Sequence, residues 1–203
     1  MYRVALTGNI ASGKSVVAEV WKRKGAAVVD ADELAREAVA PGSPGLQEVR
    51  RRFGESVIAP DGSLDRAVLR RIVFEDEARR SDLESVLHPI IARLRRAADA
   101  GLARRGTSIV VHVIPLLFET GLDATFDCVV FVDASERTRL TRLVEHRQLD
   151  PMEAERMIAA QMPAAVKRAR AHLVIDNEST LHELEAAAAV AWREIERRAE
   201  QAE

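Results

Sequence analysis

The sequence has few cysteines, few aromatic residues and no long apolar run. A single cysteine in 203 residues cannot form an internal disulfide, which is typical of a protein in a reducing compartment. Cys128 lies in an apolar run, where a buried structural thiol is expected. No apolar stretch approaches the roughly 20 residues of a membrane span. The first strand pattern begins at the N-terminus, where it leaves no room for a signal peptide. We therefore expect a cytoplasmic protein without a membrane partner.

An excess of charge of either sign is also missing. Thirty basic and 32 acidic residues give a net charge of −2, so bulk charge indicates no nucleic-acid partner. The arginines are clustered locally, which is compatible with a small polyanionic ligand. The length and a hydrophobic content of 47% suit one compact α/β unit with small insertions. We expect a monomer.

What the sequence does contain, at its N-terminus, is a phosphate-binding loop. Residues 4–6 are an apolar run typical of a buried parallel strand. Gly8, Gly13, Lys14 and Ser15 then match G-x-x-x-x-G-K-[ST], and an amphipathic helical pattern follows. Strand, loop and helix come in the order that the motif requires.

The chemistry of this loop explains its spacing. Backbone N–H groups wrap a polyphosphate, and the positive end of the helix dipole adds to the attraction. Lys14 is expected to reach the β and γ phosphates, and the Ser15 hydroxyl to bind Mg²⁺. The predicted nucleotide-binding residues of the loop are Asn9, Ile10, Ala11, Ser12, Gly13, Lys14, Ser15 and Val16.

Two carboxylates follow the second predicted strand, residues 26–29. Because ligands bind at the carboxyl ends of strands in open α/β sheets, Asp30 and Asp32 are candidates to accept a proton or to hold Mg²⁺. Either one could instead cap the helix that follows. Asp32 is the stronger candidate for a chemical role.

An arginine-rich helical stretch interrupts the alternation of strands and helices. Helices are predicted over 46–53, 65–74 and 81–100, and we interpret residues 33–106 as a helical substrate insertion. Most of its arginines should lie on solvated helix faces. His88 and Pro89 fall in the last of these helices, and Pro89 could occupy the first turn of a helix.

The second half of the chain returns to buried strands, predicted over 109–114, 128–132 and 173–175. The strand at 109–114 carries no terminal acid, so a conventional Walker B aspartate is missing there. With the first two strands, these predict a doubly wound, mostly parallel five-stranded sheet. Asn177, after the last strand, either lines a nucleotide base or serves the turn.

Between the last two strands lies a basic helix–loop–helix pattern, with helices predicted over 135–144 and 152–162 and a polar break over 145–151. It resembles a lid that closes over phosphates and excludes water. A solvated helical hairpin is the alternative.

Together these segments resemble the dephospho-coenzyme A kinase family over nearly the whole chain. The resemblance lies in residues 7–15, 30–32, 35–36, 41–42, 53–54, 61–66, 87–89, 115–119, 161 and 174–177. The phosphate loop alone is generic, whereas its combination with Asp-Ala-Asp, His-Pro and Pro-Leu-Leu-Phe-Glu is specific. Asn9 and Ala11 replace glycines that are usual in this family, Val16 replaces a threonine, and His172 stands where an aspartate is common.

The resemblance implies ATP-dependent phosphorylation of the ribose 3′-hydroxyl of dephospho-coenzyme A. It implies a P-loop kinase fold with a nucleotide core (1–32, 107–136 and 168–203), the coenzyme A region (33–106) and a lid (137–167), within one domain. The implied catalytic residues are Asp32 as general base, Lys14, Arg142 and Arg147, or His146 if the lid loop is shifted by one residue. The implied substrate-binding residues are Asp32, Arg36, Arg66, His88 and Leu117, and Asn177 joins the nucleotide-binding set.

Three other functions share part of this pattern or need motifs that can be checked in the sequence. A nucleoside monophosphate kinase would share the core and lid but not the motifs at 87–89 and 115–119. A regulatory GTPase needs Asn-Lys-x-Asp and Asp-x-x-Gly, and the sequence contains neither. A binding module without catalysis would not need Asp32 or basic residues in a lid.

Overall fold

A computed structural model describes residues 1–202, without the side chain of residue 75; residue 203, the end of the predicted core range, lies outside the described part. The chain divides into two compact units, which are described separately. The first consists of Met1–Val29 and Leu102–Glu203, and the second of Asp30–Gly101. The functional division into core, substrate region and lid stays a prediction.

A five-stranded sheet carries the first unit. Its order is β2-β3-β1-β4-β5, and the pairs β1–β3, β1–β4 and β4–β5 are parallel. This confirms the predicted fold class. The strands are β1 Tyr2–Gly8, β2 Ala27–Asp30, β3 Ile109–Val113, β4 Cys128–Asp133 and β5 Leu173–Asp176. Because β1 lies in the centre, the loop that follows it lies at the middle of the carboxyl edge, where such sheets bind ligands.

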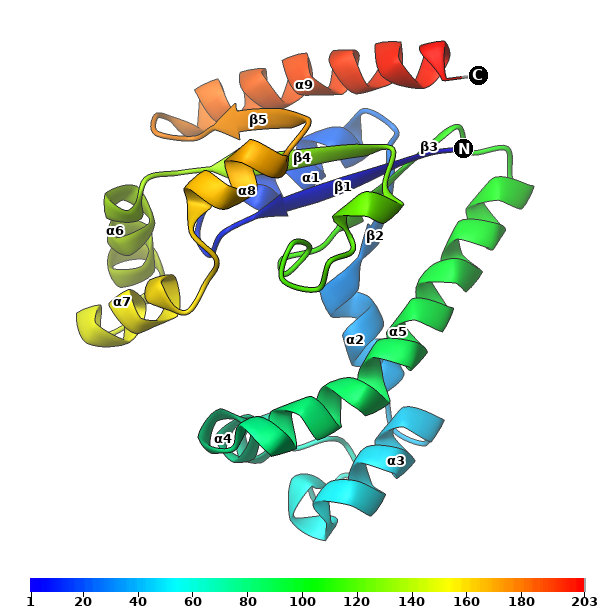
Figure 1. Ribbon diagram of the computed structural model, residues 1–203, viewed down its shortest axis with the longest axis vertical. Helices are drawn as coiled ribbons and strands as arrows, with labels where there is room; N and C mark the ends of the chain where they lie inside the picture. The colour runs from blue at the N-terminus through cyan, green and yellow to red at the C-terminus, as the bar shows by residue number, and fades with distance from the viewer. Residues whose placement is uncertain (203) are drawn as a thin grey trace. The chain divides into compact units, whose positions relative to one another are not determined.

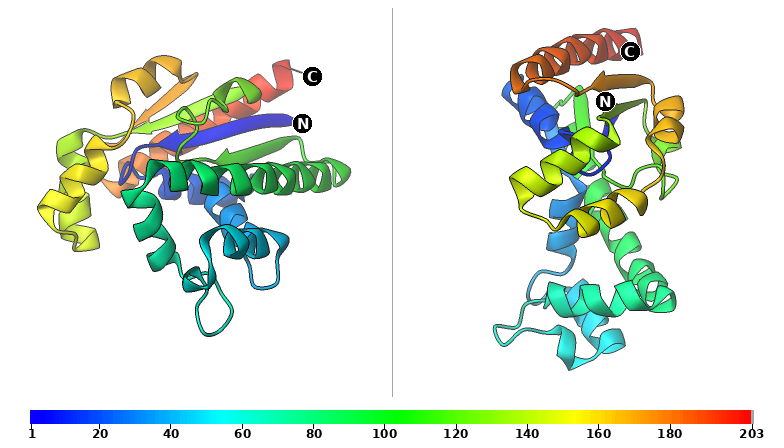
Figure 2. Two further views of the ribbon diagram at one scale, coloured as in Figure 1. Left: turned by 60° about the horizontal axis from the view of Figure 1, so that its bottom comes forward. Right: turned by 90° about the vertical axis from the view of Figure 1, so that its left-hand side faces the viewer.

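Helices α1 (Lys14–Arg23) and α9 (Leu181–Gln201) lie together against one face of this sheet, as Figure 2 shows. Val4 and Leu6 of β1 point to this face, as the period of two in a strand requires. Trp21 and Trp192 join the two helices, with ring centroids 5.8 Å apart. The Trp21 indole N–H donates to the Ala188 carbonyl at 2.7 Å. The aromatic pair therefore fixes the helix that begins at the phosphate loop.

The predicted lid, residues 137–167, contains nearly all of α6 (Glu136–Arg147), α7 (Pro151–Ala159) and the first part of α8 (Ala164–Arg170). The predicted break over 145–151 was placed too early, because α6 continues to Arg147 and ends where Gln148 adopts a left-handed φ of 55°. The second lid helix ends at Ala159, not at residue 162. Helix α8 was not predicted, since its seven residues offer too short an apolar pattern.

The second unit is helical (Figure 1). Its helices are α2 Ala31–Ala38, α3 Pro44–Phe53, α4 Arg66–Glu75 and most of α5 Glu77–Arg104, with a 3₁₀ turn at Glu55–Val57. Its core consists of Val39, Leu46, Val49, Val57, Leu69 and Val86. Pro89 does not lie in a first turn, because α5 begins twelve residues earlier at Glu77. A proline inside a helix removes one backbone donor and bends the helix, and α5 bends along its length in Figure 1.

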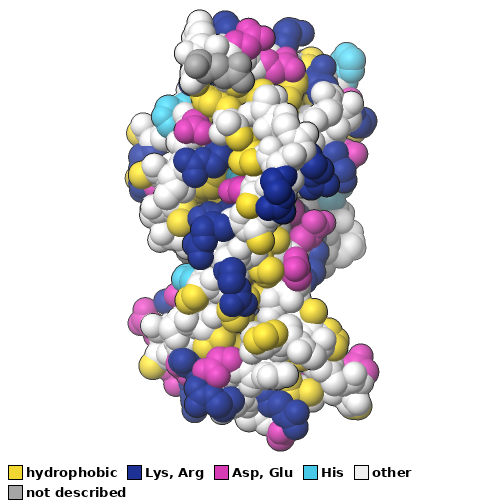
Figure 3. Space-filling view, turned by 90° about the vertical axis from the view of Figure 1, so that its right-hand side faces the viewer, with side chains coloured by type: hydrophobic (Ala, Val, Ile, Leu, Met, Phe, Trp, Pro, Cys, Tyr) yellow, Lys and Arg dark blue, Asp and Glu magenta, His cyan; other side chains and the backbone are white. Residues whose placement is uncertain are grey.

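Many arginines of the helical insertion are paired with acidic neighbours. Arg50 bonds Glu55 at 2.6 Å, Arg51 bonds Glu48 at 2.5 Å, and Arg52 contacts both Glu48 and Asp82. On the face drawn in Figure 3, basic side chains are interspersed with acidic and apolar ones. These paired arginines therefore lie on solvated helix faces, as predicted.

Two expectations from the composition concern Cys128 and the membrane. Cys128 is a free, buried thiol, and burial raises its pKa, which disfavours the reactive thiolate form. Among the described residues, no helix combines the length and the apolar character that crossing a bilayer requires.

Replacing Trp192 by alanine should destabilise the protein by about 3–5 kcal/mol, because the side chain is 5% exposed and leaves a cavity against Trp21. Val190 lies on the same helix and is 57% exposed, so Val190→Ala should change the stability by no more than about 0.5 kcal/mol. Urea unfolding followed by circular dichroism measures both. Equal losses in the two variants would show that α9 is not held through the tryptophan pair.

Candidate active site

The phosphate loop connects β1 to α1. Gly13 is the N-cap of α1, with φ 95° and ψ 10°, and no side chain caps the helix. The first turn also carries no acidic residue. The first N–H groups of the helix are thus left for an anion, and the helix dipole favours one there.

Both glycines of the motif are required by their surroundings. A Cβ atom at Gly8 would come within 2.5 Å of the Ser12 hydroxyl and 2.6 Å of the Val132 carbonyl, and one at Gly13 would collide with the Asn177 amide. Ala11 adopts φ 59°, a left-handed conformation that glycine adopts without strain. The alanine therefore keeps the expected loop conformation at the expense of local strain.

Arg142 of α6 holds this loop from outside. Its guanidinium donates to the Ala11 carbonyl at 3.2 Å, and to the backbone and side-chain oxygens of Asn177, both at 3.1 Å. The Asn177 amide in turn donates to the Ser12 carbonyl at 2.8 Å. The Ala11 and Ser12 carbonyl groups of the loop are therefore hydrogen-bonded within the protein.

Asn177 was predicted either to line a base or to serve the turn. Its side chain is 4% exposed, and both of its polar atoms are bonded to Ser12 and Arg142. In this arrangement the side chain supports the loop, and any effect on a nucleotide is transmitted by the loop. Asn9 and Ser12 have buried side chains too, and the Ser12 N–H donates to the Asn9 carbonyl at 3.1 Å.

The structure distinguishes the two aspartates after β2. Asp30 is the N-cap of α2, and its carboxylate accepts the backbone N–H of Asp32 at 2.7 Å. Asp32 lies in the first turn of that helix with an exposed side chain. Within the described residues its carboxylate has no hydrogen bond or ion pair. The capping role therefore belongs to Asp30, and the carboxylate of Asp32 is available for chemistry.

The other predicted site residues fall into two groups. In the first unit Lys14 and Val16 are half-buried, while Ser15 and Arg147 are exposed, and the Arg147 guanidinium has no partner in the described part of the chain. Leu117 is completely buried, whereas the adjacent Leu116 is 50% exposed. The side chain of Leu117, which was predicted to bind substrate, therefore exposes no surface in this structure.

The predicted substrate residues Arg36, Arg66 and His88 belong to the second unit, together with Asp32. All three side chains are exposed. Unlike Arg50 to Arg52, neither Arg36 nor Arg66 forms an ion pair within the described residues. The structure thereby separates paired arginines of this unit from ones that can bind an anion.

Helix α8 is fixed by three cations that the sequence reasoning gave no role. Lys167 is completely buried, and its ammonium lies 2.6 Å from the Glu119 carboxylate. Arg170 bonds Asp123 at 2.7 Å and stacks over Phe118, 4.9 Å from the ring centroid. The resemblance noted for residues 115–119 was the only signal for Glu119, and nothing local pairs it with a lysine 48 positions later.

Arg168, the third of these cations, joins the ends of β4 and β5. Asp133 and Asp176 are register partners, and Arg168 bonds Asp133 at 3.1 Å and contacts Asp176 at 2.5 Å. The Arg168 guanidinium lowers the pKa of the Asp176 carboxyl. One guanidinium therefore pairs with both strand-end acids.

His172, one of the departures noted above, also has a structural role. Its backbone N–H donates to the Val129 carbonyl, and its Nδ1 accepts the Val129 N–H at 2.9 Å. An aspartate could accept the same N–H. The replacement therefore keeps the pairing between β4 and the start of β5.

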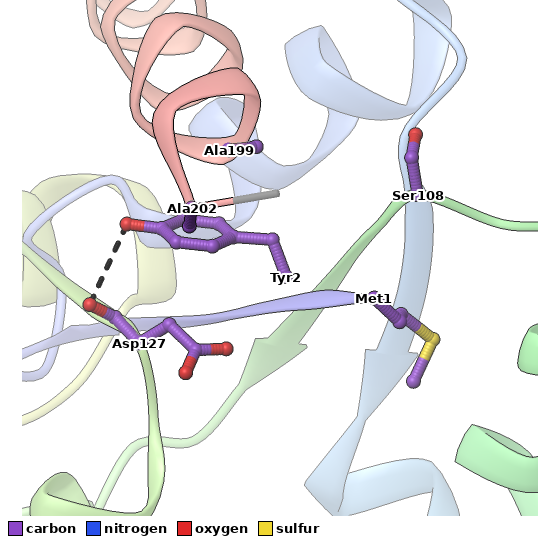
Figure 4. A pocket seen from close by; sticks show the side chains of 6 residues that line it. All are labelled: Met1, Tyr2, Ser108, Asp127, Ala199 and Ala202. Atoms are coloured by element: carbon purple, nitrogen blue, oxygen red, sulfur yellow. Dashed lines mark hydrogen bonds between the residues drawn. The ribbon is translucent and has the colours of Figure 1, made fainter.

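A small cavity of about 140 Å³ lies at the other end of the sheet, beside the start of β1 (Figure 4). It is lined by Met1, Tyr2, Ser108, Asp127, Ala199 and Ala202. It lies at the amino ends of the strands, so we do not assign it to the ligand site. Within residues 1–202 no group of three or more His, Cys, Asp or Glu side chains could hold a metal.

Comparisons with known proteins agree on one family. The family model for CoaE, dephospho-CoA kinase, matches residues 2–183. A curated dephospho-CoA kinase of Streptomyces avermitilis is 42% identical over 201 residues, covering 99% of this chain and 97% of that protein. One of Leifsonia xyli is 47% identical over 184 residues, covering 90% and 93%. The crystal structure of TT1252 from Thermus thermophilus has a TM-score of 0.82 at 35% identity, covering 95% and 97% of the two chains.

Removing the charge of Glu119 and removing the charge of Lys167 should lower the unfolding free energy by different amounts. Glu119→Gln leaves a buried ammonium without its counter-charge and should cost about 3 kcal/mol of unfolding free energy. Lys167→Met fills the same volume with an apolar chain, and Glu119 is partly hydrated, so the loss should stay below about 1 kcal/mol. Guanidinium unfolding of both variants gives the comparison. A greater loss for Lys167→Met would contradict this account of the pair.

Proposed function

The chain belongs to the dephospho-CoA kinase family, and we propose that it transfers the γ-phosphoryl group of ATP to the ribose 3′-hydroxyl of dephospho-coenzyme A. The products are coenzyme A and ADP, and the reaction is the last step of coenzyme A biosynthesis. The observation that carries the proposal is the family match over residues 2–183 together with an intact phosphate loop at the central strand. Because the reaction consumes ATP, we place it in the cytoplasm, and we propose a monomer with no nucleic-acid partner.

ATP binding falls to the phosphate loop in this proposal. The N–H groups that begin α1 and the Lys14 ammonium neutralise the β and γ phosphates. Arg142 and Asn177 support the loop through its carbonyl groups. The triphosphate therefore meets a site whose donors are already oriented, which lowers the reorganisation needed for transfer.

Mg²⁺ fits the hydroxyl of Ser15. This side chain is exposed in the first turn of α1, and its hydroxyl makes no hydrogen bond within the described residues. Mg²⁺ usually combines one or two protein oxygens with phosphate oxygens and water, so a dedicated cluster of acids is not required. When bound, the ion would neutralise charge on the transferring phosphoryl group.

Asp32 is the proposed general base. A ribose hydroxyl is a poor nucleophile at neutral pH, and a carboxylate can orient it and accept its proton. Because the transition state of phosphoryl transfer is loose, the proton moves late and orientation contributes much of the effect. The availability of the Asp32 carboxylate, with Asp30 as the helix cap, supports this role.

The acceptor is proposed to bind residues of the helical insertion. Arg36 and Arg66 offer unpaired guanidinium groups to its phosphates, and His88 offers a hydrogen-bonding ring. In the segment after β3, the side chain of the predicted substrate residue Leu117 is buried, whereas that of Leu116 is 50% exposed. The resemblance implies these two arginines, and the absence of an ion pair at either one within the described residues is compatible with that role.

The test of the function is ATP consumption with dephospho-coenzyme A, with detection of coenzyme A as the product. Lys14→Ala should abolish turnover while the circular dichroism spectrum stays that of the wild type, because Lys14 faces phosphate and contributes little to the core. Nucleoside monophosphates and shikimate serve as alternative acceptors. Faster turnover of any of these than of dephospho-coenzyme A would contradict the proposed substrate.

Asp32→Asn should lower kcat by about 10²- to 10⁴-fold, the usual range for loss of a general base. The KM for ATP should change little, since the loop and Lys14 hold the phosphates. Asp30→Asn is the matched control, because asparagine caps a helix about as well as aspartate, and it should keep nearly full activity. Steady-state kinetics of both variants decides the matter. Full activity in Asp32→Asn with loss in Asp30→Asn would move the base to Asp30.

Arg147 and Arg142 should differ in their kinetic effects. Arg147 has no protein partner in the described residues, so its guanidinium is available to stabilise charge on the transferring phosphoryl group. Arg147→Ala should therefore lower kcat by about 10³-fold. Arg142 is bonded to the loop, so Arg142→Ala should mainly raise the KM for ATP. His146→Ala tests the shifted alternative. A loss of kcat in His146→Ala but not in Arg147→Ala would transfer the role to His146.

A further inference from the structure

Two adjacent residues of the phosphate loop are hydrogen-bonded to two adjacent residues that follow α7 in the predicted lid. The Gln161 side chain accepts the Ile10 backbone N–H at 2.8 Å. The Asn9 side chain donates to the Met162 carbonyl at 3.5 Å. Each segment contributes one side chain and one backbone group. We call these four residues the loop–lid clasp.

The shorter bond of the clasp determines the orientation of Ile10. A backbone N–H in a partly buried position needs an acceptor, and here that acceptor is a side chain from a segment 151 positions away. Ile10 directly precedes Ala11, whose φ of 59° is the strained point of the loop. The bond fixes the Asn9–Ile10 peptide, one residue before the strained Ala11, and so restrains the chain that leads into that residue.

Residues of α6 and of the segment that follows α7 thereby both hold the loop. Arg142 of α6 binds the Ala11 carbonyl, and Gln161, which follows α7, binds the Ile10 N–H. The Ile10 N–H belongs to the Asn9–Ile10 peptide and the Ala11 carbonyl to the Ala11–Ser12 peptide, so the two bonds lie on either side of the Ile10–Ala11 peptide. A displacement of either lid helix would consequently alter the hydrogen bonding of the same turn.

We propose that Gln161 and Asn9 are positioning residues: through the clasp, the position of the lid sets the shape of the phosphate loop and so its affinity for a triphosphate. The kinetic part of this inference rests on the proposed function, whereas the hydrogen bond does not. Neither residue needs to touch the phosphates. The Asn9 side chain is 3% exposed and acts through its bond to the Met162 carbonyl.

Hydrogen exchange of the Ile10 amide tests the bond without any substrate. Gln161→Met keeps the size but removes the acceptor, and should speed exchange at Ile10 about tenfold. Gln161→Glu retains an oxygen acceptor and should restore the protection. Gln148→Met is the matched control, since Gln148 is the other glutamine of the lid and donates only to Glu145 within it. Unchanged exchange in Gln161→Met would overturn the clasp.

Kinetics then tests the coupling. Gln161→Met should raise the KM for ATP about tenfold, with kcat and the KM for dephospho-coenzyme A changed less than about threefold. Asn9→Ala should raise the KM for ATP by a smaller factor. In the double variant the rise should be less than the product of the two, because both bonds join the same segments.

The outcomes separate the two proposals. Faster exchange at Ile10 with an unchanged KM for ATP would overturn the coupling and leave the kinase function intact. A wild-type protein that does not phosphorylate dephospho-coenzyme A would overturn the proposed function, and the exchange experiment would still report on the clasp. Circular dichroism confirms that each variant is folded.

Discussion

A phosphate loop can direct its backbone N–H groups at an anion only if its carbonyl groups find partners elsewhere. Here Arg142 binds the Ala11 carbonyl and Asn177 binds the Ser12 carbonyl. Both partners come from the last third of the chain, so the N-terminal motif is incomplete until β4, α6 and β5 have assembled beside it. Glu178 supports the same arrangement, since its carboxylate accepts from Ser135 and Thr138 at the start of α6. Hydrogen bonding from Thr138 lowers the pKa of Glu178, which keeps this carboxylate charged.

The features predicted from the sequence were those determined locally. The phosphate loop and the five strands follow from short patterns, and the structure places all five in one sheet. The aspartate pair shows where local reasoning stops. Both residues suit a helix N-terminus, and only the backbone conformation, with Asp30 extended at φ −94° and Asp32 already helical, decides which one is the cap.

The features that were missed depend on contacts between distant positions. The role of Asn177 is set by Ser12, 165 positions earlier, and no pattern near Asn177 indicates that its amide is already used. Leu116 and Leu117 are equivalent in sequence, yet one is half exposed and the other completely buried. Helix α8 is fixed mainly by ion pairs to the connection between β3 and β4 and to the ends of β4 and β5, rather than by an apolar stripe. Periodicity cannot reveal such a helix.

The left-handed alanine of the loop has a consequence for sequence change at that position. Alanine and glycine codons differ by a single base, so glycine is within one mutation of Ala11. In the folded state glycine would relieve about 1–2 kcal/mol of strain, but it would also enlarge the unfolded ensemble by about 0.4–1 kcal/mol. The second effect offsets only about half of the first, so glycine at this position should be slightly more stable than alanine. Bulkier β-branched residues would add steric strain at this φ, and selection would remove them.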